Sequence, residues 1–241
     1  MVKFGIAAVC AALLSLNLNA ASVEENIAAK IKEINENVVV DSVVASPWAG
    51  MYEVTLGTGE TLFSDERSEY LVVGQMFNLV PGEGLVNLTA LKNQKKVVAK
   101  LDELSDEEKI VYPAEGEERA VVHVFTDISC YYCQKLHKNI PELQANGVTV
   151  KYLAFPRAGE GSEVAKQMQS VWCASDQKAA MSRAKAKQRV EESLCSDVVA
   201  EQYVLGQQLG VQATPTVFAP DGRLMAGFAS VERLLFDLNL L

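Results

Sequence analysis

The chain has 241 residues, of which 49% are hydrophobic and 22% are charged, and its formal net charge at pH 7 is −9. This balance is typical of a globular protein that can build one or two hydrophobic cores, and it argues against intrinsic disorder. The basic residues are dispersed, apart from a short stretch from Lys92 to Lys100 that suits one solvated helix face. Composition therefore gives no reason to expect nucleic acid as a partner.

The first 20 residues have the three parts of a secretory signal: Lys3 at the basic start, an apolar stretch from Phe4 to Leu16, and the small residue Ala20 at a cleavage point. We expect cleavage after Ala20, so that residues 1–20 are a signal peptide and the mature protein is exported. The apolar stretch is shorter than the ~20 residues that span a bilayer, and no later segment comes close. We therefore expect no membrane insertion, and loss of Cys10 with the signal.

Residues 21–85 are predicted to form a small domain that combines a helix with a sheet. Apolar side chains recur at helical spacing from Val23 to Ile34, and short β-branched and aromatic runs separated by turn residues follow from Val38 to Val80. A domain of this size buries a modest share of its surface and is often completed by a partner, so it is a candidate dimerisation domain. The alternative is a sheet that packs against its own helix with no partner.

The helical period returns from Asn87 to about Leu104, with a narrow apolar stripe and many charges. This pattern suits a helix that packs on one side only. The acidic stretch from Ser105 to Lys109 and the segment from Pro113 to Glu118 have the composition of a solvated hinge. We predict a linker helix and hinge over residues 86–112, with a domain boundary near Pro113.

Residues 113–241 are predicted to form a second domain, of the α/β class. Ala120 to Thr126 has the composition of a buried strand, a helix follows it and stops at Asn146-Gly147, and Val148 to Phe155 is a second strand. We expect Pro141 to kink the helix. A strand, a helix and a strand of these lengths form a βαβ unit with parallel strands and a right-handed crossover.

The remainder of this domain alternates helical and extended patterns. From about Ser162 to Leu209 the pattern is helical throughout, which predicts a helical insert over residues 162–209. Val211 to Phe228 is predicted to form two short strands around the turn Pro220-Asp221-Gly222, and Ser230 begins a terminal helix.

Two cysteines, Cys130 and Cys133, lie two residues apart where the first strand of the α/β domain turns into its helix. The N-terminal end of a helix favours a thiolate and can lower a cysteine pKa from about 8.5 to roughly 3.5 to 7.5. The second cysteine is close enough to attack any mixed disulfide that the first one forms. The pattern predicts a thiol-disulfide exchange site, in which Asp127 either raises the pKa of a neighbouring thiol or caps the turn.

The order of elements, with Thr214-Pro215 entering the third strand, looks like a thioredoxin fold with a helical insertion. More narrowly, several stretches of the chain resemble DsbC-type periplasmic disulfide isomerases of the thioredoxin superfamily. These stretches are PWAGMYEV (47–54), VNLTA (86–90), HVFTDISCYYCQKLH (123–137), KYLAFPR (151–157), VWCA (171–174), SLCSD (193–197) and LGVQATPTVF (209–218). The resemblance implies an α+β N-terminal dimerisation domain, a linker helix and an α/β thioredoxin-fold catalytic domain. Two departures are the dipeptide Tyr131-Tyr132, where better-known members carry a small residue first, and a linker a few residues longer than expected.

By this resemblance Cys130 is the exposed thiolate nucleophile and Cys133 the buried resolving thiol. Pro215 is a cis-proline beside them, and Thr214 flanks the active site and offers backbone groups to an extended substrate. The rings of Tyr131 and Tyr132 either stack on unfolded substrate or are simply exposed loop aromatics. No cofactor is implied.

The resemblance also implies partners and a location. The protein is expected in the periplasm of a Gram-negative-type cell, as a V-shaped homodimer with two sites facing an apolar cleft. Its substrates are unfolded or misoxidised exported proteins, and a DsbD-type membrane thiol reductase supplies electrons.

The other two cysteines that follow the signal, Cys173 and Cys195, allow two interpretations. All four cysteines together could bind zinc, but there is no second CxxC and the spacing fits neither a finger nor a ribbon. A structural disulfide between Cys173 and Cys195, each near a helix end, is favoured. His137 falls four residues after Cys133 on the same helix face, where a proton-transfer or metal role is open and a boundary histidine is favoured.

Three functions are therefore compared. The first is a disulfide isomerase with reductase activity. The second has the same fold but a different reaction: the protein is an oxidant, or a specialised reductase resembling DsbG. The third is a holdase chaperone in which the CxxC motif is dispensable; the first is favoured over it because a holdase needs no acidic CxxC beside a candidate cis-proline.

Overall fold

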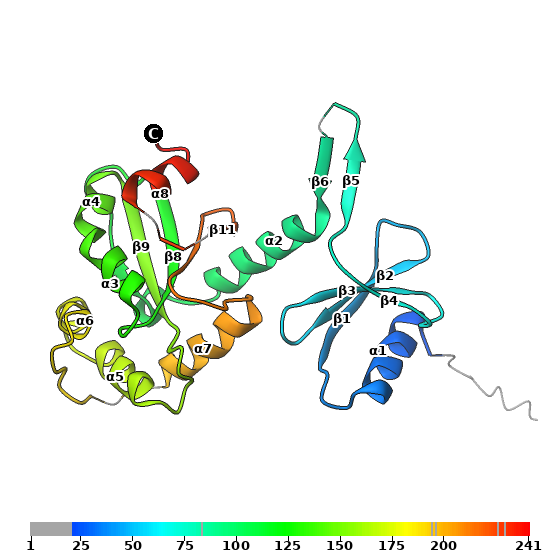
Figure 1. Cartoon of the computed structure of the whole chain (residues 1–241), viewed down its shortest axis with the longest axis horizontal. Coiled ribbons are helices and arrows are strands. Elements are labelled where there is room, and N and C mark those ends of the chain that lie inside the picture. Colours follow the sequence, from blue (N-terminus) through cyan, green and yellow to red (C-terminus); the bar gives the residue numbers. More distant parts are fainter. Residues whose placement is uncertain (1–20, 83, 194, 196, 226, 229) are drawn as a thin grey trace, which may run out of the picture.

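The computed structural model describes residues 21–82, 84–193, 195, 197–225, 227–228 and 230–241. The expected signal peptide, with Cys10, lies outside the described residues. The chain forms two bodies, each with its own sheet, and helix α2 (Leu88–Asp102) runs between them (Figure 1). No helix in the described part of the chain is long and apolar enough to cross a membrane.

The N-terminal body is one helix packed on an antiparallel sheet. Helix α1 (Val23–Ile34) begins at a capping box in which Ser22 and Glu25 satisfy each other's backbone N–H groups. Its Ile27 and Ile31 are buried against the sheet. The four strands lie in sequential order: β1 (Val40–Ala45), β2 (Met51–Leu56), β3 (Thr61–Asp65) and β4 (Leu71–Val73).

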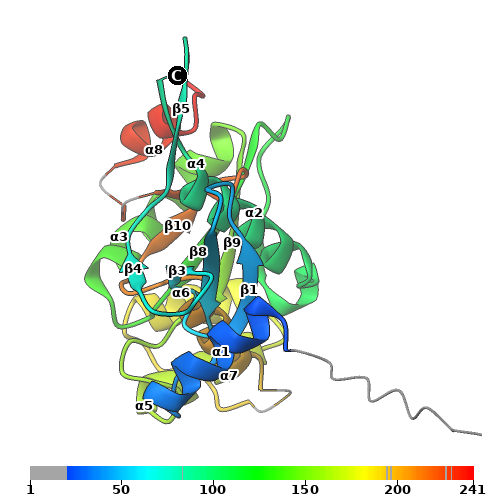
Figure 2. The ribbon, with the colours of Figure 1, turned by 90° about the vertical axis from the view of Figure 1, so that its right-hand side faces the viewer.

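A separate hairpin follows this sheet, made of β5 (Phe77–Val80) and β6 (Gly84–Asn87). The sequence pattern did not predict it as a unit. Figures 1 and 2 both show it projecting away from the four-stranded sheet. Strand β4 and the hairpin expose large apolar side chains: Leu71, Val72, Val73, Phe77, Leu79 and Leu85.

Helix α2 contacts both bodies. Asn87 caps its N-terminus, and the ammonium group of Lys92 lies 2.9 Å from the Glu53 carboxylate on β2. Further along the helix, Val97 and Leu101 are buried in the core of the second body. The predicted one-sided helix is therefore present, and its apolar side packs on the C-terminal body.

The C-terminal body is built on a five-stranded sheet in the order β11-β10-β8-β9-β7. Its strands are β7 (Ile110–Tyr112), β8 (Ala120–Thr126), β9 (Val148–Ala154), β10 (Thr216–Phe218) and β11 (Leu224–Met225). Strands β8 and β9 pair in parallel, as the predicted βαβ unit requires, and β7, β10 and β11 are antiparallel to their neighbours. Residues 110–112, which we had placed in the linker, therefore form an edge strand of this sheet, because β9 offers them a free edge.

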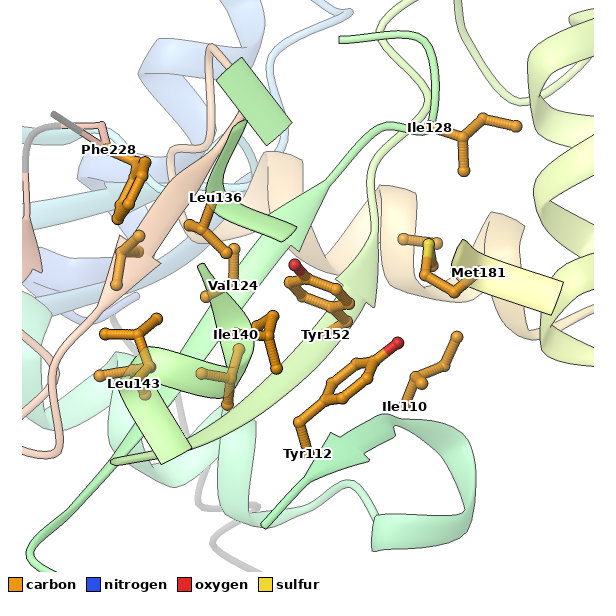
Figure 3. Packing of buried hydrophobic residues seen from close by; sticks show 14 of the residues in the cluster. Ile110, Tyr112, Val124, Ile128, Leu136, Ile140, Leu143, Tyr152, Met181 and Phe228 are labelled. Carbon is orange, nitrogen blue, oxygen red and sulfur yellow. The ribbon is translucent and has the colours of Figure 1, made fainter. Parts of the chain in front are cut away.

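Helices cover both faces of the sheet. Alternate residues of β8 and β9 point to one face, where α3 (Tyr131–Lys138), α4 (Ile140–Ala145) and α8 (Val231–Asp237) bury their apolar side chains (Figure 3). The residues between them, such as Phe125 and Leu153, point to the other face and meet α2 and the end of α7 (Val198–Gln208). The sheet is thus buried on both sides, as parallel pairing requires.

Two details of the predicted helices need correction. The helix after β8 does not kink but ends at Lys138, and a new helix with Pro141 in its first turn follows. The insert is helical in α5 (Glu163–Trp172), α6 (Gln177–Lys185) and α7, but not throughout: residues 188–193, 195 and 197 are not helical. The bond between Cys195 and Cys173 ties this stretch back to the end of α5, which a continuing helix could not allow.

The docking of α2 on the C-terminal body can be tested with Leu101→Ala. Leu101 is 2% exposed, so truncation should lower the free energy of unfolding of this body by about 2 to 5 kcal/mol. Leu91→Ala, on the same helix at 44% exposure, is the matched control and should change it by less than about 1 kcal/mol. Urea unfolding followed by the fluorescence of Trp172, with Trp48 replaced by Phe, measures both. Equal effects of the two substitutions would show that α2 is not docked.

Candidate active site

The CxxC motif sits at the carboxyl end of the central strand β8. The chain leaves the strand at Thr126, turns through Asp127, and enters α3 with Cys130 as the residue that precedes its first turn. The backbone N–H of Cys130 donates to the Asp127 carbonyl, 3.2 Å away. Cys130 therefore lies at the helix N-terminus and Cys133 lies within the first turn.

Asp127 fixes the shape of this turn. Its carboxylate is buried and accepts hydrogen bonds from the backbone N–H and hydroxyl of Ser129, at 2.6 and 2.7 Å. Its other oxygen accepts from the Arg157 backbone N–H at 2.9 Å and lies 3.5 Å from the Arg157 guanidinium. Of the two roles considered for Asp127, this geometry is that of a turn cap, and it also ties the CxxC turn to the loop after β9.

Thr214 and Pro215 lie beside Cys130, although 84 residues separate them in sequence. The Thr214–Pro215 peptide bond is cis, and the Cys130 thiol donates to the Thr214 carbonyl at 3.2 Å. The Thr214 hydroxyl is buried and makes no hydrogen bond of good geometry with any described residue. It is therefore free to donate to a sulfur anion at Cys130.

Cys130 is 3% exposed, which corrects the expectation of an exposed nucleophile. The Thr214 backbone covers its sulfur, because the thiol turns toward that carbonyl. Burial alone raises the pKa of Cys130. The Thr214 side chain and the backbone N–H groups of Cys133 and Tyr132 outweigh burial, so the pKa lies below its ordinary value. The position of Cys130 at the helix N-terminus acts in the same direction.

Cys133 is fully buried, and its pKa is shifted the other way. Burial raises the pKa of Cys133 more than Lys185 and the Thr126 side chain lower it. Both cysteines are thiols, not bonded to each other. The site thus holds one thiol that ionises readily and one that resists ionisation.

Tyr131 and Tyr132 stand on the solvent side of the motif. They are 70% and 58% exposed, and their rings form an edge-to-face pair with centroids 5.4 Å apart. An exposed aromatic pair of this kind presents apolar surface next to Cys130.

The predicted structural disulfide is confirmed. Cys173, which ends α5, is bonded to Cys195, with the two Cα atoms 5.6 Å apart. These two sulfurs are therefore not available for the zinc arrangement considered above.

His137 lies at the boundary of the core, as the sequence favoured. Its ring nitrogens contact the hydroxyls of Ser182, at 3.1 Å, and Tyr152, at 3.4 Å. Burial, with a smaller contribution from Lys185, lowers the pKa of His137 to about 4.

One residue near the thiols escaped the sequence analysis. Lys185, the last residue of α6, is 5% exposed and lies below the CxxC turn. A signal was present, since Lys185 follows the buried Met181 by four residues and so shares its helix face. A lysine is almost never fully buried without a partner, which makes it the least expected residue of the site.

The fold and the site together define a class: a thioredoxin-like thiol-disulfide oxidoreductase that carries a further N-terminal domain. Residues 105–239 match the thioredoxin-like domain family, and residues 18–90 match the family described as disulfide bond isomerase protein N-terminal domain.

Similar proteins narrow this class. The thiol:disulfide interchange protein DsbC of Salmonella typhimurium is 39% identical over 186 residues, which cover 77% of this chain and 75% of that protein. DsbC of Haemophilus influenzae is 36% identical over 222 residues, 92% of each chain. The crystal structure of a disulfide interchange protein from Neisseria gonorrhoeae, at 30% identity, covers 56% of this chain and 96% of that chain with a TM-score of 0.50. The chain belongs to the DsbC family of thiol:disulfide interchange proteins.

The ionisation of Cys130 can be tested by following thiolate ultraviolet absorbance against pH in the reduced protein. The absorbance should rise below the ordinary thiol range, and Cys130→Ser should remove that step. Thr214→Val, which deletes the unpartnered hydroxyl, should reduce the thiolate fraction at pH 6 by about tenfold, the effect of one hydrogen bond to a charged group. Thr216→Val is the control, because the Thr216 hydroxyl donates to the Ala213 carbonyl. If both valine variants titrate like the wild type, Thr214 has no part in activating Cys130.

Proposed function

We propose that this disulfide isomerase acts through Cys130 as nucleophile and Cys133 as resolving thiol, on unfolded or misoxidised exported proteins in the periplasm. The observation that carries the proposal is the placement of the two thiols within one helical turn: Cys130 lies at the N-terminus of α3 against the Thr214 carbonyl, and Cys133 is fully buried. These surroundings shift the two thiol pKa values in opposite directions. The thiolate is the reactive form of cysteine in disulfide exchange. At neutral pH the attacking group is therefore Cys130.

The chemistry is two successive exchanges. The Cys130 thiolate attacks one sulfur of a wrong disulfide, a Cys130–substrate disulfide forms, and the other substrate sulfur leaves as a thiolate. In isomerisation, a third substrate thiolate then attacks the mixed disulfide and releases Cys130. Where none arrives, Cys133 attacks Cys130 instead, the substrate leaves reduced, and the Cys130–Cys133 disulfide needs a reductant, for which we propose a DsbD-type membrane thiol reductase.

Thr214 and Pro215 support the docking of an extended substrate. Because the cis bond opens β10 beside Cys130, the backbone of Thr214 lies next to the reacting sulfur. The thiol contact at the Thr214 carbonyl must give way when substrate binds, and the carbonyl can then accept from a substrate N–H. Tyr131 and Tyr132 add apolar contact on the other side.

The N-terminal domain is proposed to form a homodimer. Its exposed apolar residues lie on β4 and on the β5–β6 hairpin, where pairing with a second copy would bury them. Two copies would place two sites across a shared cleft of a V-shaped dimer, which suits a large unfolded substrate. We keep the division into residues 21–85, 86–112 and 113–241 as a proposal for the limits of the domains, except that residues 110–112, as strand β7, belong to the C-terminal domain.

The exposed Tyr131-Tyr132 pair supports a second candidate, a specialised DsbG-like reductase or an oxidant on the same fold. The two residues between the cysteines lie in the first turn of α3 and are largely exposed, so a change there can alter the stability of the disulfide without changing the fold. The redox state of the Cys130–Cys133 couple in growing cells separates the candidates: a mostly oxidised couple supports an oxidant.

Refolding of a scrambled multi-disulfide protein tests the catalytic roles. Cys130→Ser should lose the recovery of native disulfides, because no mixed disulfide can form. Cys133→Ser should accumulate a Cys130–substrate adduct visible by mass spectrometry, with part of the isomerisation retained. The double variant Cys173→Ser, Cys195→Ser is the matched control for loss of cysteine, and should keep its activity. Recovery by Cys130→Ser equal to wild type would favour the holdase hypothesis.

The dimer interface can be tested by sedimentation at micromolar concentration. Wild type should sediment as a dimer, and Leu79→Lys, on the exposed hairpin, should give monomers because two charges would face each other across the pair. Leu224→Lys places the same charge on an exposed leucine of β11 and should remain a dimer. A monomeric wild type would remove the shared cleft from the proposal.

A further inference from the structure

A buried lysine lies directly beneath the active-site turn. The ammonium group of Lys185 donates to the Thr126 hydroxyl at 2.6 Å and to the Asp127 carbonyl at 2.9 Å, and it lies 5.6 Å from the centre of the Tyr152 ring. Cys133 lies in the first turn of the helix that follows this turn, and its pKa, which burial raises, is lowered by both Lys185 and the Thr126 side chain. Thr126 thus connects the lysine of α6 to the resolving cysteine of α3.

The two hydrogen bonds of Lys185 engage two of its three N–H donors, and neither neutralises its charge. An ammonium ion removed from water needs an anion, and without one its charged form is disfavoured. Burial lowers the pKa of Lys185 to about 8, while Cys133, Asp127 and Cys130 oppose this effect. The Asp127 carboxylate is already engaged by Ser129 and Arg157. A sulfur anion is the partner that the site lacks until it reacts.

We propose that Lys185 is a positioning residue for the resolving step: its buried ammonium, acting directly and through the Thr126 hydroxyl, stabilises the Cys133 thiolate that attacks the mixed disulfide on Cys130. The proposal rests on the proposed roles of the two cysteines. Cys133 loses its proton, its sulfur bonds to that of Cys130, the Cys130–substrate bond breaks, and the proton ends on the departing substrate thiolate. The Cys133 thiolate supplies the electron pair of the new S–S bond, and the electron pair of the broken Cys130–substrate bond leaves with the substrate sulfur. Cys133 is thereby oxidised and the substrate sulfur reduced, so no other oxidant or reductant is needed.

The same charge biases the resting redox state. In the reduced protein Lys185 faces sulfurs that can carry negative charge, whereas in the Cys130–Cys133 disulfide it faces neutral sulfur. A buried cation is therefore more stable in the reduced protein. Lys185 should make the couple a stronger oxidant than it would be with an apolar residue at this position, and so help to keep Cys130 available as a thiolate.

Two other titratable groups near Lys185, Tyr152 and His137, keep one charge state in the working range. Burial raises the pKa of Tyr152 well above its ordinary value and lowers that of His137 to about 4, so both stay neutral near pH 7. Asp127 is ion-paired with Arg157. A change in the pH profile of resolution on replacing Lys185 is therefore assignable to the lysine and the two thiols.

The test compares Lys185→Met with wild type in the full-length mature protein. Methionine has a similar length and suits a buried site, and it removes the charge together with the hydrogen bonds to Thr126 and Asp127. Two quantities are measured: the equilibrium constant of the Cys130–Cys133 couple with glutathione, and the pH dependence of the rate at which Cys133 resolves a glutathione adduct on Cys130. We expect the equilibrium constant to change on the order of tenfold toward the disulfide, which corresponds to about 30 mV, and the rate profile to move to higher pH.

Lys109→Met is the matched control. Lys109 is similarly buried and also makes two hydrogen bonds, in its case to the backbone carbonyls of Leu101 and Leu104. It belongs to the segment after α2 and not to the active-site turn. It should leave both measurements at their wild-type values. Thr126→Val should shift them in the direction of Lys185→Met, and Thr126→Ser, which keeps the hydroxyl, should not.

Several outcomes would overturn the proposal. One is a Lys185→Met variant whose equilibrium constant and pH profile equal those of wild type. Another is an equal shift in Lys185→Met and Lys109→Met, because that result would mean that removing any buried cation has the same effect. If Lys185→Met does not fold, the comparison of Thr126→Val with Thr126→Ser is the test. Equal equilibrium constants and pH profiles in these two variants would reject the proposed link through the Thr126 hydroxyl. Failure of the proposed function looks different, because wild type itself would then not resolve the adduct.

Discussion

The pairing of β8 along both of its edges is the constraint on which the rest of the site depends. Strand β9 pairs with it in parallel and β10 antiparallel, so the end of β8, the loop after β9 and the start of β10 meet at one place. That meeting brings Cys130 into contact with Thr214, and Asp127 into contact with Arg157, across long stretches of sequence. Because β8 is buried on both faces, its position cannot shift, and the helix that starts after it begins at a fixed point.

The difference between the two thiols follows from their places in that helix. At the N-terminus, Cys130 receives backbone N–H groups that have no partner within the helix, and these favour the anion. One turn later, Cys133 faces the apolar core, where the anion is disfavoured. A spacing of two residues therefore places one thiol where its anion is favoured and the other where its anion is disfavoured, and Thr214 adds to the effect on Cys130.

Much of this arrangement could be predicted from the sequence, because local patterns carry it. The buried composition of β8, the CxxC after it and the proline before β10 all point to one edge of one sheet, and the cis bond at Pro215 and the disulfide of Cys173 with Cys195 are both present. The features that the sequence pattern did not predict depend on tertiary contacts. Strand β7 has only three residues, and only the free edge of β9 makes it a strand. Lys185 is a charged residue on an otherwise apolar helix face. Hydrophobic periodicity predicts an apolar residue at such a position, and the buried lysine is explained only by partners that the tertiary structure supplies.

Helix α2 determines how the two parts of the protein can act together. Its first half is joined to β2 through Lys92 and Glu53, whereas Val97 and Leu101 in its second half belong to the core that lies behind Phe125 of β8. The Gly222 turn between β10 and β11 packs so closely on this helix that a Cβ atom there would overlap the Gln94 carbonyl. A helix packed in this way cannot rotate freely on the C-terminal body. On its other side, α2 is joined to the N-terminal sheet by two surface ion pairs, Lys92 with Glu53 and Lys96 with Asp41. The Gly59 turn of that sheet also packs closely on the Gln208 carbonyl at the end of α7. Polar and backbone contacts, rather than a shared core, therefore connect the N-terminal sheet to the rest of the protein (Figure 1).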